Sequence, residues 1–572
     1  MRHGSWEIGG FDRDTAVEFL RSGINPLVSV FLASRGFSDV EDAQAFLDDS
    51  SFSFPFHDPY LMIDMDKAVS RIKKAVDAGE RIAVYGDYDV DGMTASVVLA
   101  LWLQSKGADY EIYIPGRFDE GYGLNNPALD LLKSRKVTLV VTVDCGVTAI
   151  EEAKHAASIG LDLVITDHHE CKDILPEVCA VVDPKRPDCG YPYKSLAGVG
   201  VAFKLVCALE ENHLSDDIFK QYSEFVAVGT IADVMPVVGE NRELIRRGLS
   251  ILNSDPRPGF RSLLQETGTE PGKVSASTVG FTLAPRLNAA GRMGQAELSV
   301  ELLLTENTEK AEELAALLCR LNSERRSLEL EILEEAEAML PDAGPDGPIV
   351  LARRGWYQGV TGIVAAKMSE RYRLPVIIIS IDDDGISRGS CRSFGSFAIY
   401  DALCSCDDIL DNYGGHEMAA GVTVAEENIE ELRRRITNFY NDSIEVIPHA
   451  GLMLDFEVEK PELLTLKNIE ALEHLEPFGN GNPSPSLCIL GAVLISAQSI
   501  GAGRHSKLKI EKSGALLDCI FFSVPAEELG VSDGALVDIA FEPQVNEFKG
   551  RCSVQLQLFD IRESSAELCT GQ

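Results

Sequence analysis

Three aspartates, Asp87, Asp89 and Asp91, stand at alternate positions in the stretch YGDYDVDG, directly after the apolar run RIAV. In a continuing strand their side chains would point to two faces, whereas in a loop all three can converge. Gly86 and Gly92 favour the loop. Carboxylates this close together need a bound cation or raised pKa values. The stretch therefore predicts chemistry based on a metal ion or on carboxylates that retain protons.

Further acids and two histidines follow other apolar runs. They are Asp144 in VTVDCG, Asp167, His168 and His169 in ITDHHE, and Asp233 in VAVGTIADVMP. Taken singly, an aspartate after a strand commonly caps the next helix. Taken together, these carboxylates and imidazoles are the ligands that suit Mn²⁺ or Mg²⁺, and they do not fit a cysteine-rich zinc site. Two such ions about 3.5 to 4 Å apart can activate water and stabilise a phosphoryl displacement.

The elements that must position these residues are short strands alternating with helices. Residues 59–235 contain the apolar runs RIAVYG, YEIYIPG, VTLVVTVD, LDLVITD and CAVVDP, separated by amphipathic segments. This alternation predicts an α/β fold with a mainly parallel sheet. Ligands of such sheets bind beyond the carboxyl ends of the strands, where the first, third and fourth runs place their acids. Asp233 instead follows a predicted helix.

The remaining sequence predicts a long helix, a second α/β unit and a barrel. Residues 305–340 lack Gly and Pro and carry Leu at helical spacing, so we expect one amphipathic helix that bridges two domains. The Pro/Gly-rich segment 341–348 ends it. The strands PIVLAR and PVIIISI and the loop YGGHEMAAG then indicate a smaller α/β unit. Beyond residue 450, alternating strands predict an OB-like β-barrel.

Composition limits the class of protein. The 572 residues are 45% hydrophobic, enough for several domains with cores, and the formal charge of -38 disfavours nonspecific nucleic-acid binding through net charge. Thirteen cysteines without a CxxC pair fit a reducing, cytoplasmic compartment. The stretch MRHGSWEIGGFDRD lacks the apolar region of a signal peptide, and no later run reaches the length of a membrane span. We expect neither export nor membrane insertion.

Four motifs in order, DYDVDG, VTVDCG, DHH and GTIADVMP, resemble those of the DHH phosphoesterases. The resemblance is closer to the RecJ single-strand-specific exonucleases, because PGRFDEGYG, LAGVGVAFKL, LAPRLNAAGRM, WYQGVTGIVAAK and GGHEMAAG are also similar to that subfamily. It extends over nearly the whole chain. The implied domains are an N-terminal helical segment (1–58), a DHH phosphoesterase domain (59–245), a helical connector (246–344), a DHH-associated substrate-binding domain (345–447) and an OB-fold-like nucleic-acid-binding domain (448–572).

The resemblance also implies the roles of the acidic residues and histidines. His169 would face the scissile phosphate or the nucleophile, and Asp167 would orient a histidine. Asp144 would bridge two ions, while the distribution of the first three aspartates between the ions stays open. The implied ligands are Asp87, Asp89 and Asp144 for one ion, and Asp91, Asp144, His168 and Asp233 for the other.

Substrate contacts must come from local cationic and polar groups in this acidic chain. The expected phosphate contacts, with ordinary surface charge or a structural turn as the alternative, are Arg286, Asn288, Arg292, Arg388, Ser390, Arg392, Ser393 and His416. Lys204 also lies in a stretch that resembles the family. Tyr357 stands where similar sequences often have His, which leaves the role of that position open. In the barrel, GRHSKLKI supplies Arg504, Lys507 and Lys509 for a bound strand.

The leading hypothesis is a metal-dependent exonuclease that uses two Mn²⁺ or Mg²⁺ ions to hydrolyse single-stranded DNA. The resemblance implies digestion from the 5′ end to mononucleotides in DNA recombination and repair, with single-strand-binding protein and a recombination helicase as partners. A DHH hydrolase of short oligonucleotides or cyclic dinucleotides is one alternative, but such substrates need neither the barrel nor the long helix. A catalytically inert nucleic-acid-binding paralogue is the other, and the presence of every candidate ligand argues against it.

Overall fold

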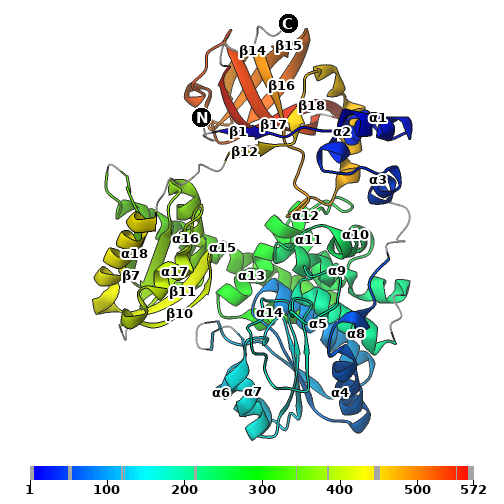
Figure 1. The fold of residues 1–572 in the computed structure, drawn as a ribbon, viewed down its shortest axis with the longest axis vertical. Coiled ribbons are helices and arrows are strands. Elements are labelled where there is room, and N and C mark those ends of the chain that lie inside the picture. Colours follow the sequence, from blue (N-terminus) through cyan, green and yellow to red (C-terminus); the bar gives the residue numbers. More distant parts are fainter. Residues whose placement is uncertain are drawn as a thin grey trace. The chain divides into compact units, whose positions relative to one another are not determined.

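The computed structural model describes residues 5–48, 55–117, 120–121, 123–211, 215–342, 344–382, 385–443, 451–548 and 550–564. Within the stretch PGRFDEGYG, residues 118, 119 and 122 therefore lie outside the described residues. The chain divides into two compact units (Figure 1). The larger unit comprises Phe54–Ile447 and Gly479–Gly481, and the smaller comprises Met1–Ser53, Pro448–Phe478 and Asn482–Gln572.

A five-stranded parallel sheet carries the acidic motifs of the larger unit. Its strand order is β3-β2-β4-β5-β6, and every neighbouring pair is parallel. All residues of β2, β4 and β6 are buried, as expected for strands covered on both faces. The predicted parallel sheet is thus confirmed. Its strands are β2 (Ile82–Tyr85), β3 (Tyr110–Tyr113), β4 (Leu139–Val143), β5 (Asp162–Thr166) and β6 (Ala180–Val182).

Helices cover both faces of this sheet because the side chains of each strand alternate. Ile82 and Val84 of β2 belong to one buried cluster, and Ala83 and Tyr85 belong to another. The first cluster contains residues of α4 (Met65–Ala78), α5 (Val90–Ser105), α8 (Gly198–Leu209) and α9 (Asp216–Ala232). The second contains residues of α6 (Asn126–Ser134) and α7 (Ile150–Ser158).

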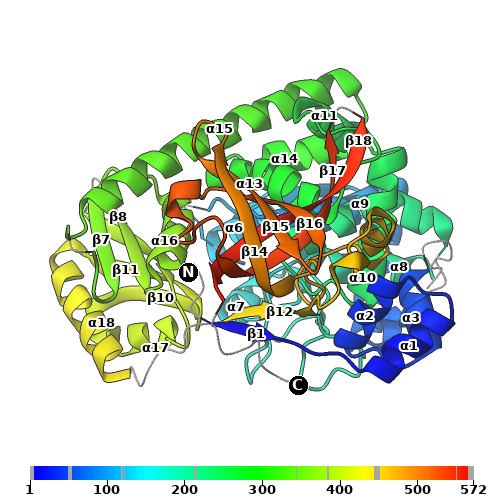
Figure 2. The same cartoon turned by 90° about the horizontal axis from the view of Figure 1, so that it is seen from above.

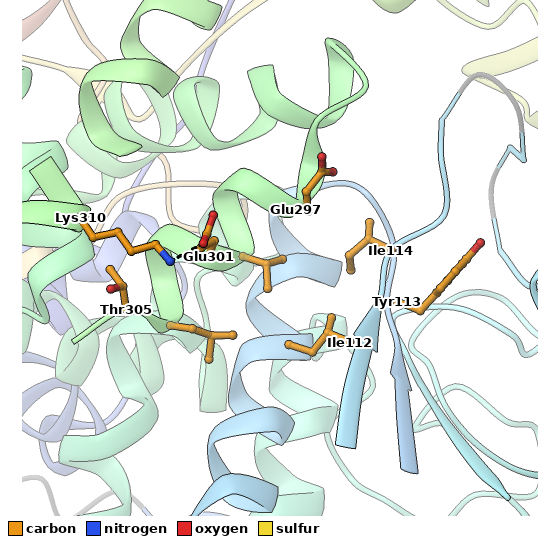
Figure 3. A pocket seen from close by; sticks show the side chains of 9 residues that line it. Ile112, Tyr113, Ile114, Glu297, Glu301, Thr305 and Lys310 are labelled. Carbon is orange, nitrogen blue, oxygen red and sulfur yellow. Dashed lines mark ion pairs between the residues drawn. The ribbon is translucent and has the colours of Figure 1, made fainter. Parts of the chain in front are cut away.

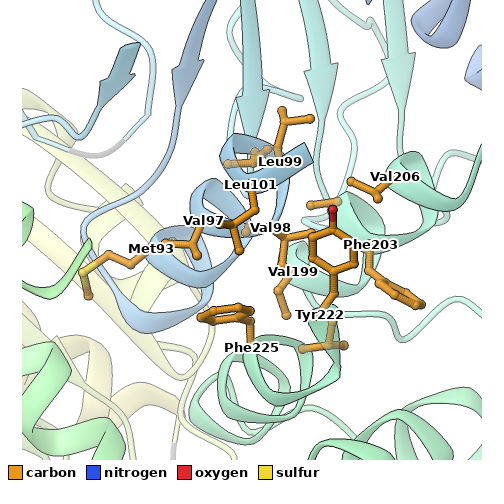
Figure 4. Packing of buried hydrophobic residues seen from close by; sticks show 14 of the residues in the cluster. Met93, Val97, Val98, Leu99, Leu101, Val199, Phe203, Val206, Tyr222 and Phe225 are labelled. Atoms are coloured by element: carbon orange, nitrogen blue, oxygen red, sulfur yellow. The ribbon is translucent and has the colours of Figure 1, made fainter. Parts of the chain in front are cut away.

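Helix α5 is the centre of the larger cluster. Its residues 90–103 are all buried, so it is packed on every side. Figure 4 shows Val97 and Val98 of α5 among Phe203 of α8 and Phe225 of α9. This packing holds α5 against α8 and α9. The first turn of α5 carries Asp91 and follows Asp87 and Asp89, so the packing also fixes where these aspartates lie.

A 31-residue helix, α15 (Thr308–Ala338), bridges the two domains of the larger unit, as the view in Figure 2 also shows. Its first half packs with the parallel-sheet domain through α11 (Pro258–Glu266), α13 (Ala284–Arg292) and α14 (Ala296–Leu304). Its last turns pack with α16 (Gln358–Tyr372) of the second domain. The predicted bridging helix is confirmed. Within the part of the chain that the structure covers, no helix is long and apolar enough to cross a membrane.

The second domain is a smaller α/β unit built on a mixed sheet of order β10-β11-β9-β8-β7. Only β7 and β8 run parallel, and the other neighbours are antiparallel. The helices α16, α17 (Ile399–Cys404) and α18 (Ile429–Ser443) pack on it. The strands are β7 (Ile349–Arg354), β8 (Val376–Ile381), β9 (Ile386–Arg392), β10 (Leu410–His416) and β11 (Ala419–Ala425).

The smaller unit contains a closed β-barrel, as predicted. Its strands follow the order β13-β14-β15-β16-β18-β17, and β17 pairs again with β14 to close the barrel. The N-terminal helices α1 (Arg13–Arg21), α2 (Pro26–Ser34) and α3 (Val40–Leu47) contribute residues to the barrel's core. Its main strands are β14 (Leu487–Ile500), β15 (His505–Lys512), β16 (Ala515–Phe521), β17 (Leu536–Phe548) and β18 (Arg551–Glu563), and the short strand β13 (Phe456–Glu457) adds to its edge.

Three residues from the C-terminal third of the chain complete the larger unit. Within Gly479–Gly481, the Asn480 carbonyl accepts from Val237 N–H at 2.6 Å, and the Asn480 side-chain amide donates to the Val234 carbonyl at 3.0 Å. These bonds hold the turn that follows α9. The turn begins next to Asp233, so residues distant in sequence support the acidic motifs.

Candidate metal centre and phosphate site

The acidic motifs converge at the carboxyl ends of the parallel strands. Three overlapping groups of side chains each offer ligand atoms within 4.8 Å of one another. Asp144 belongs to two of the groups, and His168 also belongs to two. The groups are Asp87, Asp89 and Asp144; Asp91, His168 and Asp233; and Asp144, His168 and His169. The structure therefore brings together all the ligand residues that the family resemblance implied.

Local hydrogen bonds orient the first aspartates. Asp89 caps α5 by accepting from Gly92 N–H at 3.0 Å, so the helix-cap interpretation also holds for this residue. Asp91 lies in the first turn of α5 and accepts from the N–H groups of Gly198 and Val199, at 2.6 and 2.9 Å. These donors are the first residues of α8, whose N-terminus favours negative charge. Two helix starts therefore fix the carboxylates.

The backbone at Asp144 adopts the left-handed conformation, with φ of +62°, which is uncommon for a residue with a side chain. A Cβ at Gly198 would lie 2.5 Å from Asp144 Oδ1, and one at Gly229 would lie 2.9 Å from Asp91 Oδ1. The carboxylates therefore sit in space that only glycine leaves open. Strain and close approach at one point are typical of a functional site.

Electrostatics show that these carboxylates fit a cation. Burial, reinforced by neighbouring aspartates, raises the pKa values of Asp87, Asp91 and Asp144 well above the ordinary range. Burial together with Asp89 raises the pKa of Asp233 to about 7. Asp87 Oδ1 is buried and has no hydrogen-bond partner in the described part of the chain. Divalent cations would supply the missing positive charge, so the residues present fit Mn²⁺ or Mg²⁺.

The two histidines have different surroundings. Burial and the neighbouring His169 lower the pKa of His168 to about 3, which leaves a neutral imidazole suited to metal ligation. Burial opposes protonation of His169, but the hydrogen bond and charge of Asp167, together with the charges of Asp233 and Asp91, outweigh burial and raise the pKa to about 9. His169 Nδ1 lies 2.7 Å from Asp167 Oδ1. Asp167 also accepts from Val147 N–H at 2.9 Å, so it is a fixed partner that orients His169.

A group of four arginines, of which Arg325 is buried and the others are half-buried, adjoins the acidic centre. Burial, reinforced by the nearby guanidinium groups of Arg117, Arg325 and Arg392, lowers the pKa of Arg292 to about 10. Cations concentrated in this way are favourable only beside an anion. On the same helix as Arg292, Asn288 Oδ1 accepts from Val90 N–H at 3.2 Å, between two of the aspartates. The arginine group therefore forms a candidate phosphate site beside the metal centre.

The second domain contributes polar groups to this phosphate site. Arg292 Nη1 donates to the Gly359 carbonyl at the start of α16, at 3.4 Å. The hydroxyls of Thr361 and Ser390 lie 3.0 Å apart. A Cβ at Gly362 would lie 3.5 Å from Arg392 Nη2. Arg392 and Ser390 on β9 thus meet the first turn of α16, and this helix N-terminus also favours an anion.

Other predicted contact residues have local partners of their own. Arg388 pairs with Asp382 at 3.6 Å, and the buried hydroxyl of Ser393 donates to the Phe397 carbonyl. His416 is exposed at the end of β10 and belongs to none of the ligand groups. Arg286 Nη1 donates to the Thr282 carbonyl, at 2.6 Å. A role of these residues in substrate binding therefore stays a prediction.

The expectation that Lys204 contacts substrate is wrong. Its side chain is fully buried, and Nζ lies 2.6 Å from Glu240 Oε1 and 3.0 Å from the His57 carbonyl. It therefore has a structural role in the core. Tyr357 is the residue before α16 and packs with the cluster around that helix.

Three residues of the phosphate site were missed by the sequence analysis: Arg117, Arg325 and Thr361. Arg117 lies in PGRFDEGYG, a stretch whose resemblance could have identified it. Arg325 lies on the long helix, where its periodic neighbours make it look like surface charge. In the structure it is buried and donates to Glu329 at 2.5 Å.

A pocket of about 490 Å³ lies away from these residues, between β3 and the helices α14 and α15 (Figure 3). Ile112, Ile114 and Val300 form part of its wall, and Lys310 pairs with Glu301 at its rim. None of the ligand or arginine residues lines it. The chemistry of the molecule is therefore assigned to the acidic centre.

Comparison with known families agrees with this arrangement. The sequence matches the DHH family N-terminal domain over residues 81–230, the DHHA1 domain over 346–442 and the RecJ OB domain over 454–560. The single-stranded-DNA-specific exonuclease RecJ of Bacillus subtilis is 40% identical, over 98% of this chain and 71% of that protein. The enzyme of the same name from Escherichia coli is 32% identical, over 95% and 96%.

Solved structures give the same assignment. The crystal structure of RecJ in complex with Mn²⁺ from Thermus thermophilus aligns with a TM-score of 0.84 at 30% identity, over 98% of this chain and 80% of that one. The Mg²⁺ complex of the same protein aligns with a TM-score of 0.78. The chain belongs to the RecJ family of single-stranded-DNA-specific exonucleases, within the DHH family.

Proposed function

We propose that this chain is a metal-dependent exonuclease that digests single-stranded DNA from the 5′ end to mononucleotides, in recombination and repair. The observation that carries the proposal is the position of the overlapping acidic groups, which share Asp144 and His168, beside the group of arginines around Arg292. Side chains that can hold metal ions therefore lie next to arginines that can bind a phosphate. This is the combination that hydrolysis of a phosphodiester requires.

The side chains divide the work. One cation would be held by Asp87, Asp89 and Asp144, and the other by Asp91, Asp144, His168 and Asp233. Bound there, the cations would activate water and neutralise charge on the phosphate. Asp144 positions both sites. His169, whose Nδ1 donates to Asp167, would present Nε2 to a phosphate oxygen or the nucleophile.

The phosphate site would receive the end of the strand. Arg117, Arg292 and Arg392 supply cationic donors, and Ser390, whose hydroxyl lies 3.0 Å from that of the buried Thr361, supplies a hydroxyl beside the N-terminus of α16. Such a group favours a phosphate with more than one negative charge, as at a strand terminus. The family resemblance assigns this terminus to the 5′ end.

We further infer that the protein works in the cytoplasm, with single-strand-binding protein and a recombination helicase as partners. Its described cysteines, which number twelve, are all free, which fits a reducing compartment. The partners follow from the substrate, because these proteins produce or cover single strands.

The test is a time course on DNA labelled at either end, single- and double-stranded, with Mn²⁺, Mg²⁺ or EDTA. We expect mononucleotides from the 5′ end of single strands, and none in EDTA. A preference for dinucleotides over long strands would favour a small-substrate hydrolase, and binding without cleavage would favour an inert paralogue. Release first from the 3′ end would overturn the proposed polarity.

A further inference from the structure

An exposed aromatic side chain lies in the helical turn that precedes α13. Phe281 is 83% exposed, more than any other large hydrophobic side chain in the described residues. It lies in η2 (Val279–Leu283), a π-helical turn in which Ala284 N–H donates to the Val279 carbonyl five residues before it. Such turns are rare and occur frequently at functional sites. The fold thus presents a phenyl ring to solvent from an unusual backbone.

A cationic group lies on the same helical run. Arg286, on α13, bends back so that Nη1 donates to the carbonyl of Thr282, the residue after Phe281. Its Nε is buried and has no hydrogen-bond partner among the described residues. The half-buried guanidinium group lies beside the turn that carries the ring, and no carboxylate among the described residues pairs with it. An arginine and an aromatic ring together match the phosphate and the base of one nucleotide.

Packing places the turn close to a metal ligand. Turn η2 packs against α9, and a Cβ at Gly280 would lie 3.6 Å from Ile231, two residues before Asp233. Val234, which follows Asp233, is 66% exposed and has a left-handed backbone, with φ of +56°. Phe281 and Val234 are thus exposed apolar groups on the two elements that meet beside the acidic centre.

We propose that Phe281 is a base-stacking residue that, with Arg286, seats one nucleotide of the strand near the scissile phosphate. The proposal deepens the proposed function and rests on it. In this arrangement a base of the strand stacks on the exposed ring of Phe281, and the phosphate of the same nucleotide pairs with Arg286. Stacking is tolerant of sequence because every base has an aromatic face, which suits a strand-degrading enzyme.

The test is a thermodynamic cycle between the ring and single bases. Kd is measured in EDTA, where no hydrolysis occurs, for oligonucleotides carrying one abasic site at successive positions. Proteins compared are the wild type, Phe281→Ala, Phe281→Trp and the control Leu131→Ala, which removes an exposed apolar side chain on α6. We expect Phe281→Ala to weaken binding about tenfold, Phe281→Trp to retain it and Leu131→Ala to change nothing.

One abasic position should reveal the seat. At that position, loss of the base should weaken binding to the wild type about tenfold. It should weaken binding to Phe281→Ala almost no further, because this variant already lacks the ring on which the base would stack. If the losses from Phe281→Ala and from the abasic site simply add at every position, the proposal is overturned. The same additive result is expected if Phe281 contacts a protein instead of a base. Failure of the proposed function is a separate result, namely the absence of Mn²⁺-dependent cleavage by the wild type.

Discussion

Asp144 is the residue on which the two proposed metal positions depend. It belongs to two of the three ligand groups, and its left-handed backbone aims the carboxylate between them. We expect Asp144→Ala to reduce hydrolysis at least about a thousandfold while the circular dichroism spectrum stays native. Asp130→Ala, which removes an exposed carboxylate on α6, is the matched control. Near-normal turnover by Asp144→Ala would contradict the bridging role.

Asp233 makes the stability of the metal-free protein depend on pH. Its pKa is about 7 in the folded protein against 3.8 ordinarily, so the folded state holds this proton more tightly than the unfolded chain. The resulting stability is complete below about pH 4 and is lost as pH rises through 7. We expect the Tm of metal-free protein to fall from pH 5 to 8, and Asp233→Asn to reduce that fall by roughly 2 to 6 °C.

Calorimetry with and without Mn²⁺ checks this. Saturating Mn²⁺ should raise the Tm of the wild type most at pH 8 and should raise that of Asp233→Asn much less. Parallel pH curves for the two metal-free proteins would show that Asp233 does not carry the effect.

The acidic residues were predictable one by one, whereas the arginine group was not. Most candidate ligands follow strands, and the parallel sheet brings the ends of its strands together, whereas Asp233 follows helix α9. Arg117 and Arg325 meet Arg292 only through tertiary packing. Lys204 shows the converse error, because nothing in its helical stretch indicates that Glu240 lies opposite it in the core.

At the scale of elements, α8 matters because its first turn packs against two of the proposed metal ligands. Its N–H groups hold Asp91, and a Cβ at Gly198 would lie only 2.5 Å from Asp144 Oδ1. We expect Gly198→Ala to displace both carboxylates and weaken Mn²⁺ binding about 10- to 100-fold in titration calorimetry. Gly190→Ala is the control, because a Cβ there meets nothing within 4 Å. Equal Mn²⁺ affinity in both variants would remove α8 from the description of the site.

Elements whose apolar residues repeat at regular spacing were predictable. Elements that form by pairing or packing with a segment far away in the sequence were not. The leucine spacing of α15 and the alternating strands of the barrel appear in the sequence itself. Strand β1 (Trp6–Ile8) instead pairs with β12 (Leu452–Leu454), and helices α1 to α3 share the barrel's core. No local pattern tells that a helical segment at the N-terminus completes a domain formed near the C-terminus.

At the scale of the whole molecule, a formal charge of -38 must coexist with binding to a polyanion. Attraction is therefore confined to a few contacts, because acids beyond about 10 Å are screened at 0.1 M salt. We expect Arg292→Ala to reduce the salt slope of single-strand binding by about 0.7, the value of one phosphate contact. Lys154→Ala, on the exposed face of α7, should leave the slope unchanged. Equal slopes for wild type and Arg292→Ala would mean that Arg292 contacts no phosphate.

The three residues Gly479–Gly481 also set an order of events during synthesis. The bond from Asn480 to Val234 joins positions 246 residues apart, so the turn beside Asp233 gains this partner only when most of the chain has been translated. At ribosomal rates of about 5 to 20 residues per second, the delay is roughly 12 to 50 s. The nascent chain therefore gains the bonds that support the turn beside Asp233 late in its synthesis. A chain released early, before residue 480, would contain every metal ligand and still lack this support.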